Sequence, residues 1–169
     1  AYQRILGTAQ DLFYRNGYRA TGINEIIEKS GVAKATFYAH FPSKDALALA
    51  YVKSMNEKES RSVEAGLRKY DGPYDKLIGL MEFLIGWSRD REYRGCTYLN
   101  ISSELTNHAH PVRQESAVHY DTLRTLVGGL TTQLKAKKGK AWKDRDADQV
   151  ADDFLLLFAG ALSLAQVYH

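Results

Sequence analysis

A basic segment over residues 31–44 holds the side chains whose types and spacing suit contact with a polyanion. Its side-chain hydrogen-bond donors include Lys34, Thr36, Tyr38, His40 and Lys44. The segment contains no Asp or Glu, although the whole chain is nearly balanced, with 23 Lys and Arg against 20 Asp and Glu. Cationic and hydroxyl donors bind phosphate oxygens and base edges, and the lack of carboxylates removes local repulsion of phosphate. The pattern therefore favours binding of nucleic acid.

A helix through this segment would sort the donors by face. With about 100° per residue and Phe37 pointing inward, Ala35 and Ala39 point most directly outward, so the outer surface has low relief. A major groove about 12 Å wide admits a helix closely when its leading side chains are small. The expected roles are base-edge contact for Lys34 and Thr36, and phosphate contact for Tyr38, His40 and Lys44.

Each donor taken alone has a plainer interpretation. Tyr38 is typical of a half-buried aromatic, His40 of a residue that caps a helix end, and Lys44 of an ordinary first-turn lysine. Their combination on one helix, after a second short helix and a tight turn at residues 30–32, favours DNA binding. That order of elements is the sequence form of a helix-turn-helix.

Helical spacing recurs along the whole chain, and no alternating apolar and polar run of useful length marks a strand. The expected fold is therefore all-α. Glycine and proline breaks, with Ser43 as an N-cap, divide the sequence into eight predicted helices. Their expected ranges are 2–16, a short helix that follows Thr21-Gly22 and ends at Gly31, 33–41, 44–70, 74–91, 97–106, 112–138 and 145–169.

The predicted helix over 44–70 joins two parts of the chain. Its second half is polar nearly all round, which is typical of a strut between packed regions. We therefore predict a three-helix helix-turn-helix domain at 1–50 and a helical bundle at 51–169. The last helix is apolar on almost every side over 154–165, so several neighbours must cover it, and a partner subunit is the economical one.

The stretch GYRATGINEIIEKSGVAKATFYAHFPSKDALALA, residues 17–50, resembles the DNA-binding region of the TetR family of bacterial transcriptional repressors. The resemblance is most specific in FYAHFPSK and is strong only within residues 1–50. Beyond them the organisation is similar, and RGCTYLNISSEL, residues 94–105, is similar to a segment at the sixth helix of many members.

The resemblance implies a role for individual residues. Family residues that match Lys34, Ala35 and Thr36 approach bases, those that match Tyr38, His40 and Lys44 hold phosphates, and Thr21 matches a helix start that contacts the DNA backbone. This sequence departs from the family where Ala33 replaces a frequent Ser or Thr N-cap and Ala35 replaces a frequent Gly. Fewer side chains then reach the groove, so we expect sequence recognition to depend more than usual on the shape of the DNA.

The resemblance also implies that residues 51–169 form a dimer interface and a pocket whose ligand releases DNA. The expected function is a ligand-responsive repressor that binds palindromic operator DNA as a homodimer through its last two helices. The expected effector is a small apolar or aromatic molecule. Bulky and polar side chains are candidates to line the pocket, with plain core packing as the alternative: Met81, Leu84, Trp87, Tyr98, Asn100, Ser103, His119, Tyr120, Leu123 and Phe158.

Other chemistry has weaker support. His108 and His110 lack the i, i+4 spacing of a helical metal site, so no metal or other cofactor is expected. Cys96 is more typical of a buried structural thiol than of a redox sensor. Since no glycine-rich phosphate loop, nucleophile elbow or zinc motif occurs, an enzyme is not expected. Two rivals stay open: an architectural DNA-binding dimer with a filled core, and a helical interaction module that does not bind DNA.

Length and composition set the remaining expectations. The 169 residues are 44% hydrophobic and 25% charged, close to globular averages. The single Cys cannot form an intramolecular disulfide, which fits a reducing cytosol. No secretory signal is visible, and the apolar run over 154–168 is shorter than the roughly 20 residues of a membrane span. We therefore expect a cytoplasmic protein that does not enter a membrane.

Overall fold

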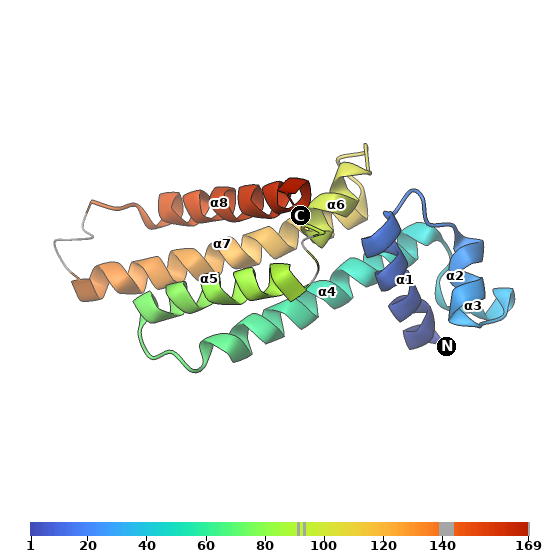
Figure 1. Ribbon diagram of the computed structural model, residues 1–169, viewed down its shortest axis with the longest axis horizontal. Helices are drawn as coiled ribbons and strands as arrows, with labels where there is room; N and C mark the ends of the chain where they lie inside the picture. Colours follow the sequence, from blue (N-terminus) through green and yellow to red (C-terminus); the bar gives the residue numbers. More distant parts are fainter. Residues whose placement is uncertain (91, 93, 139–143, 169) are drawn as a thin grey trace. The chain divides into compact units, whose positions relative to one another are not determined.

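The computed structural model describes residues 1–90, 92, 94–138 and 144–168. Within these ranges it contains eight helices and no strand, which confirms the predicted all-α fold (Figure 1). The helices are α1 (Tyr2–Asn16), α2 (Ile23–Ser30), α3 (Lys34–His40), α4 (Lys44–Leu67), α5 (Pro73–Asp90), α6 (Thr97–Ser103), α7 (Pro111–Lys138) and α8 (Ala147–Tyr168).

Local capping explains several helix starts. The Ser43 hydroxyl accepts a hydrogen bond from the Ala46 N–H at 3.0 Å and so begins α4 as predicted. The Asp146 carboxylate accepts from the Asp148 N–H at 2.8 Å, so α8 begins at Ala147 rather than at the predicted residue 145. Gly22 is the N-cap of α2, without a side-chain cap. The predicted helix ends at residues 91 and 169 lie outside the described residues.

The chain divides into two compact units. Unit 1 comprises residues 1–57 and 97–117, and unit 2 comprises residues 58–96 and 118–169. Helices α4 and α7 each contribute to both units, because the divisions at 57/58 and 117/118 fall inside them. The domain boundary near residue 50 remains a prediction.

Unit 1 is built around the inward stripe of α1. Predicted from helical spacing, the stripe is buried as expected. It packs with α2, α3 and the start of α4, and the buried side chains of these four helices include Ile5, Leu6, Ala9, Leu12, Phe13, Ile26, Phe37, Leu47 and Val52. Gly31 ends α2 in the left-handed conformation, with φ of 62°, which a residue without a Cβ adopts most readily. This turn sets the direction in which α3 leaves.

Unit 2 is a bundle of the second half of α4 with α5, α7 and α8 (Figure 1). Its core is aliphatic, with one phenylalanine, and includes Leu67, Leu80, Leu84, Leu123, Val127, Leu130, Leu134, Ala151, Phe158 and Leu162. Arg124 of α7 binds the Asp152 carboxylate of α8 through two hydrogen bonds, of 2.5 and 3.2 Å. These contacts link the last two helices at the surface of the bundle.

Candidate nucleic-acid interface and pocket

Helix α3 presents its predicted outer surface to solvent. Phe37 is fully buried, and its ring lies 6.2 Å from that of Phe41, between centroids. Tyr2 of α1 stacks on Phe41 at 4.9 Å, so rings behind the helix hold it in place. Thr36 is half-buried, and the exposed residues of the helix are Lys34, Ala35, Tyr38, Ala39 and His40. Basic and hydroxyl groups therefore surround a low-relief alanine surface.

The start of α3 lacks a side-chain cap. Ala33 is the N-cap, and its side chain makes no capping hydrogen bond, as its methyl group dictates. Helix α3 therefore lacks the capping hydrogen bond that a Ser or Thr at this position would supply. A seven-residue helix without a cap is marginal in isolation, so α3 depends on the packing of Phe37 for its existence.

Two of the predicted DNA-contacting residues are engaged within unit 1. Thr21 is fully buried, and its hydroxyl donates to the Gly17 carbonyl at 2.8 Å, so the hydroxyl is turned away from solvent. The Lys44 ammonium donates to the Thr21 carbonyl at 2.9 Å and lies 4.4 Å from the centre of the Tyr18 ring. Burial lowers the pKa of Lys44. Both residues hold the loop between α1 and α2, and their contact with phosphate stays a prediction.

A polar cluster that the sequence did not reveal joins this loop to α6 and α7. The Glu104 carboxylate accepts from the Tyr18 N–H at 2.9 Å and from the Arg19 N–H at 2.6 Å. The Tyr18 hydroxyl donates to Asp45, whose other oxygen lies 3.2 Å from His110 Nε2. Burial, and then the bond to Asp45, raise the pKa of Tyr18, while that same bond lowers the pKa of Asp45.

The residues of this cluster are far apart in sequence, so no local sequence motif indicates that they meet in the fold. The sequence gives His110 no clear role, and in the fold its Nε2 lies 3.2 Å from an Asp45 carboxylate oxygen. Within the described part of the chain, no group of three or more His, Cys, Asp or Glu side chains is arranged to hold a metal ion.

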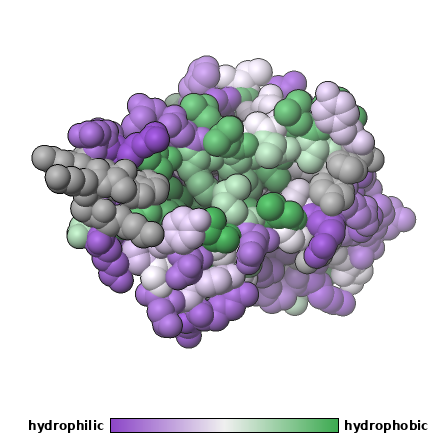
Figure 2. Space-filling view, turned by 60° about the vertical axis from the view of Figure 1, so that its left-hand side comes forward, coloured by the Kyte–Doolittle hydropathy of each residue, from purple (hydrophilic) through white to green (hydrophobic). Residues whose placement is uncertain are grey.

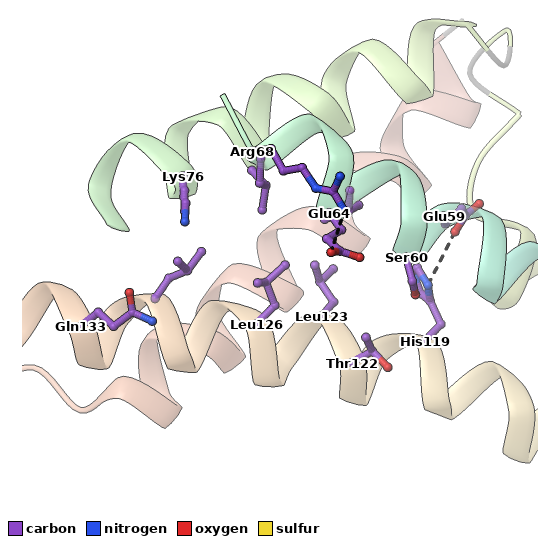
Figure 3. A pocket seen from close by; sticks show the side chains of 13 residues that line it. Glu59, Ser60, Glu64, Arg68, Lys76, His119, Thr122, Leu123, Leu126 and Gln133 are labelled. Carbon is purple, nitrogen blue, oxygen red and sulfur yellow. Dashed lines mark hydrogen bonds and ion pairs between the residues drawn. The ribbon is translucent and has the colours of Figure 1, made fainter. Parts of the chain in front are cut away.

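Unit 2 contains a pocket of about 470 Å³ between α4, α5 and α7 (Figure 3). Its apolar wall consists of Val63, Leu67, Leu123, Leu126 and Leu130. Its polar lining consists of Glu59, Ser60, Glu64, Arg68, Lys76, His119, Thr122 and Gln133. Pockets that hold small molecules span roughly 300–1,000 Å³, so this one is large enough for a ligand.

Two of the predicted pocket residues, His119 and Leu123, line this pocket. The others lie elsewhere. In unit 2, Leu84 and Phe158 are buried in the core, Trp87 and Tyr120 are half-buried, and Met81 is exposed. The remaining three belong to α6 in unit 1 and are Tyr98, Asn100 and Ser103. Whether any of the ten binds a ligand stays a prediction.

The pocket lies against the half of α4 that was expected to be a polar strut. That expectation missed Val63 and Leu67, which share a face at i, i+4 spacing and line the pocket. On α7, Leu123, Leu126 and Leu130 follow the same helical period. Aliphatic side chains repeated at helical spacing on two helices are therefore the sequence signal for this wall.

A histidine and a carboxylate, both of low exposure, meet at one end of the pocket. His119 Nδ1 lies 3.6 Å from Glu59 Oε2, and the two side chains are only 17% and 12% exposed. Burial lowers the pKa of His119 to about 4. The imidazole is therefore neutral at pH 7, since the charged form is penalised in this environment.

Cys96 is a buried thiol, as expected for a structural residue. Its Sγ lies 3.1 Å from the Tyr120 hydroxyl, and burial raises the pKa of Tyr120. The thiol is 2% exposed. Reactive cysteines lie in exposed, electropositive surroundings, so this position favours packing over redox sensing.

Helix α8 leaves much of its apolar surface uncovered in the single chain. Its exposed large side chains are Leu156, Leu157, Leu164, Val167 and Tyr168. Figure 2 shows hydrophobic side chains gathered into a patch with hydrophilic margins. By length and composition alone α8 is long enough and apolar enough to cross a membrane, and 17% of its most apolar stretch is buried in the single chain. Large uncovered apolar patches mark interaction sites.

Two family models match the chain. "Bacterial regulatory proteins, tetR family" matches residues 5–51, which include α2, α3 and their turn, and "Tetracyclin repressor-like, C-terminal domain" matches residues 73–169. The chain belongs to the TetR family. This confirms the resemblance drawn from residues 17–50, and members of the TetR family are transcriptional regulators rather than enzymes.

Several TetR-family relatives are similar over much of the chain. LmrA of Bacillus subtilis is 29% identical over 66% of this chain, and Rv1255c of Mycobacterium tuberculosis is 32% identical over 79%. The matches span 61% and 63% of those two proteins, so the chain covers less than two thirds of either relative. SCO4454, a TetR-family regulator from Streptomyces coelicolor, has a TM-score of 0.89 at 27% identity, over 98% of this chain and 84% of that one.

Proposed function

We propose that this TetR-family regulator is a cytoplasmic repressor that binds palindromic operator DNA as a homodimer and is released by a small apolar or aromatic effector. The observation that carries the proposal is the exposed surface of α3. Lys34, Ala35 and Tyr38 are exposed around it, and the segment over residues 31–44 has no carboxylate. Such a surface fits the major groove without repelling phosphate.

The dimeric part of the proposal rests on α8. Its uncovered apolar residues suit a symmetric interface formed by the last two helices of each subunit. Two α3 helices related by a two-fold axis would enter the same face of a duplex about 34–36 Å apart, or a multiple of one turn. A palindromic operator with that spacing is the expected partner.

The effector part rests on the pocket and on the continuity of α4. This one helix contains Lys44, next to the α1–α2 loop, and Glu59, Val63 and Leu67, which line the pocket. A ligand that prefers one conformation of α4 would shift the population of that conformation, and it acts only through its difference in affinity. The alternative of an architectural DNA-binding protein predicts a filled core, so the presence of this pocket favours a ligand-responsive protein.

Selection of binding sites from a random duplex pool tests the proposal. We expect an enriched palindrome whose two halves are separated by about one helical turn or a multiple of it. A mixture of unrelated sequences, or no retention even at low salt, would contradict operator binding.

The same selection tests the role of Thr36. Thr36→Ala should relax preference at one base position in each half-site, because a side chain at the groove is lost. Thr125→Ala is a matched control, since Thr125 lies on α7 and donates to the Asp121 carbonyl at 2.8 Å. A consensus unchanged by Thr36→Ala would remove Thr36 from the base-reading residues.

A further inference from the structure

One end of the pocket in unit 2 is polar. In Figure 3, Glu59, Ser60 and His119 lie together at this end, with Thr122 nearby, whereas Lys76 and Gln133 lie towards the other end. Leucine side chains of α7 lie between the two ends. A ligand that fills the pocket would therefore pass from an apolar stretch to a small set of polar atoms.

The polar end is rich in hydrogen-bond acceptors. The Glu59 side chain, which is 12% exposed, brings a carboxylate to this end, and the imidazole of His119 beside it is neutral at pH 7. The Thr122 hydroxyl donates to the Val118 carbonyl at 2.8 Å, so its proton is used within α7 while its oxygen can still accept. These groups match a ligand that brings donors.

The charges of the pocket also differ in their surroundings. Glu64 and Arg68 pair with each other at 3.1 Å, and their side chains are 70% and 74% exposed, so water and the pairing moderate both charges. Glu59 is 12% exposed and lies beside a neutral ring. In such a low-dielectric position a carboxylate interacts strongly with a charged donor.

We propose that the pocket binds an elongated apolar molecule that ends in a protonated amine, with the amine N–H groups directed at Glu59 and at the acceptors of Ser60 and Thr122. The proposal rests on the effector role given to the pocket above and specifies the class of effector. Charge-assisted hydrogen bonds are about twice as strong as neutral ones, so the charged nitrogen should dominate selectivity. The apolar part of the ligand would pack against the leucine side chains of α7 that line the pocket.

Three probes of equal chain length test this specification by calorimetry on the full chain at pH 7. They are octylamine, octanol and octanoate, which are respectively cationic, neutral and anionic. We expect octylamine to bind at least about tenfold more tightly than octanol, because only octylamine brings a cationic donor to the Glu59 carboxylate. Octanoate should bind most weakly.

Two variants locate the source of the preference. Glu59→Gln should reduce the advantage of octylamine over octanol to less than about threefold, since the charge is lost at constant size. Glu57→Gln is the matched control and should keep the advantage, because Glu57 is an exposed residue of α4 that does not line the pocket. Circular dichroism verifies that both variants fold, and the three-probe comparison on the unaltered chain requires no variant.

Three results would overturn the amine specificity. These are equal binding of octylamine and octanol, preferred binding of octanoate that Lys76→Gln abolishes, and no binding of any probe. DNA binding measured in parallel separates the two proposals. A chain that binds a selected operator but shows one of these three results refutes only the amine, whereas a chain that does not bind DNA refutes the proposed repressor.

Discussion

At the level of single residues, Phe37 determines which side of α3 faces solvent. Its burial could be predicted from the sequence, because Phe37 is the large side chain of this helix that has no polar group. The roles of Thr21 and Lys44 could not be predicted in the same way. Their partners include the carbonyl groups of Gly17 and Thr21, and backbone carbonyls have no sequence signature.

Lys44→Ala tests whether this lysine touches phosphate as well as the α1–α2 loop. We expect weaker binding to all DNA sequences and a fall of about 0.9 in the slope of log affinity against log salt, which is the contribution of one phosphate. Loss of the bond to the Thr21 carbonyl should also lower the free energy of unfolding by about 1 kcal/mol. Fluorescence anisotropy at several salt concentrations and urea unfolding measure the two effects.

Lys53→Ala is the control, because Lys53 is an exposed residue of α4 outside the predicted interface. Its salt slope should equal that of the unaltered chain. If Lys44→Ala lowers stability and leaves the slope unchanged, Lys44 has a structural role only.

His119 should make stability depend on pH. Its pKa is about 4 in the folded chain against an ordinary value of 6.5, so the unfolded chain holds more protons between these values. Stability therefore decreases as pH falls from 7 and the loss levels off below pH 4. His119→Gln should remove about 2 kcal/mol of the decrease between pH 7 and pH 5, as measured by urea unfolding.

His108→Gln is the matched control for this measurement, since His108 is an exposed histidine. It should follow the pH dependence of the unaltered chain. Equal pH dependence in the His119→Gln variant would mean that the imidazole is not held neutral in the fold.

At the level of elements, Glu104 ties the end of α6 to the loop between α1 and α2. Its carboxylate accepts two backbone N–H groups, and Gly17 leaves room for it, because a Cβ at Gly17 would lie 2.9 Å from Glu104 Oε1. Gly17 also has a φ of 89°, which other residues adopt with strain. The close approach of Glu104 is the second reason for glycine at this position.

Glu104→Gln should loosen this loop. We expect a loss of about 1–3 kcal/mol in the free energy of unfolding of unit 1, since the amide cannot accept both N–H groups as a charged carboxylate does. Amide hydrogen exchange at Tyr18 and Arg19 should accelerate. Glu28→Gln, an exposed change on α2, should leave both quantities unaltered, and protected amides in Glu104→Gln would disprove the role of the carboxylate.

The positions of the helices could be predicted from hydrophobic periodicity and from glycine and proline breaks, but the contacts between helices could not. The ends of α1, α2 and α7 agree closely with the predicted ranges, because glycines and a proline mark them. The pocket was harder to predict, since Val63 and Leu67 stand in a stretch dominated by charged residues. The Glu104 cluster joins positions more than 80 residues apart, which a local pattern cannot encode.

At the level of the whole molecule, α8 carries the proposed assembly. Leu157→Glu should convert dimers to monomers in light scattering, because a charge would be buried at the interface without a partner. Leu157 is 73% exposed in the single chain, so the variant should still fold. Ile85→Glu, on α5 with 65% exposure, is the control and should remain dimeric. Dimers that persist in Leu157→Glu would place the interface elsewhere.

The uncovered leucines of α8 also affect how the protein behaves on dilution. If burial of this helix between subunits contributes to the folded state, mass action links thermal melting to protein concentration. The melting temperature should then rise as the protein is concentrated. A single subunit would expose this apolar surface to other proteins until a second subunit covers it, so dimer formation would also protect the protein from aggregation.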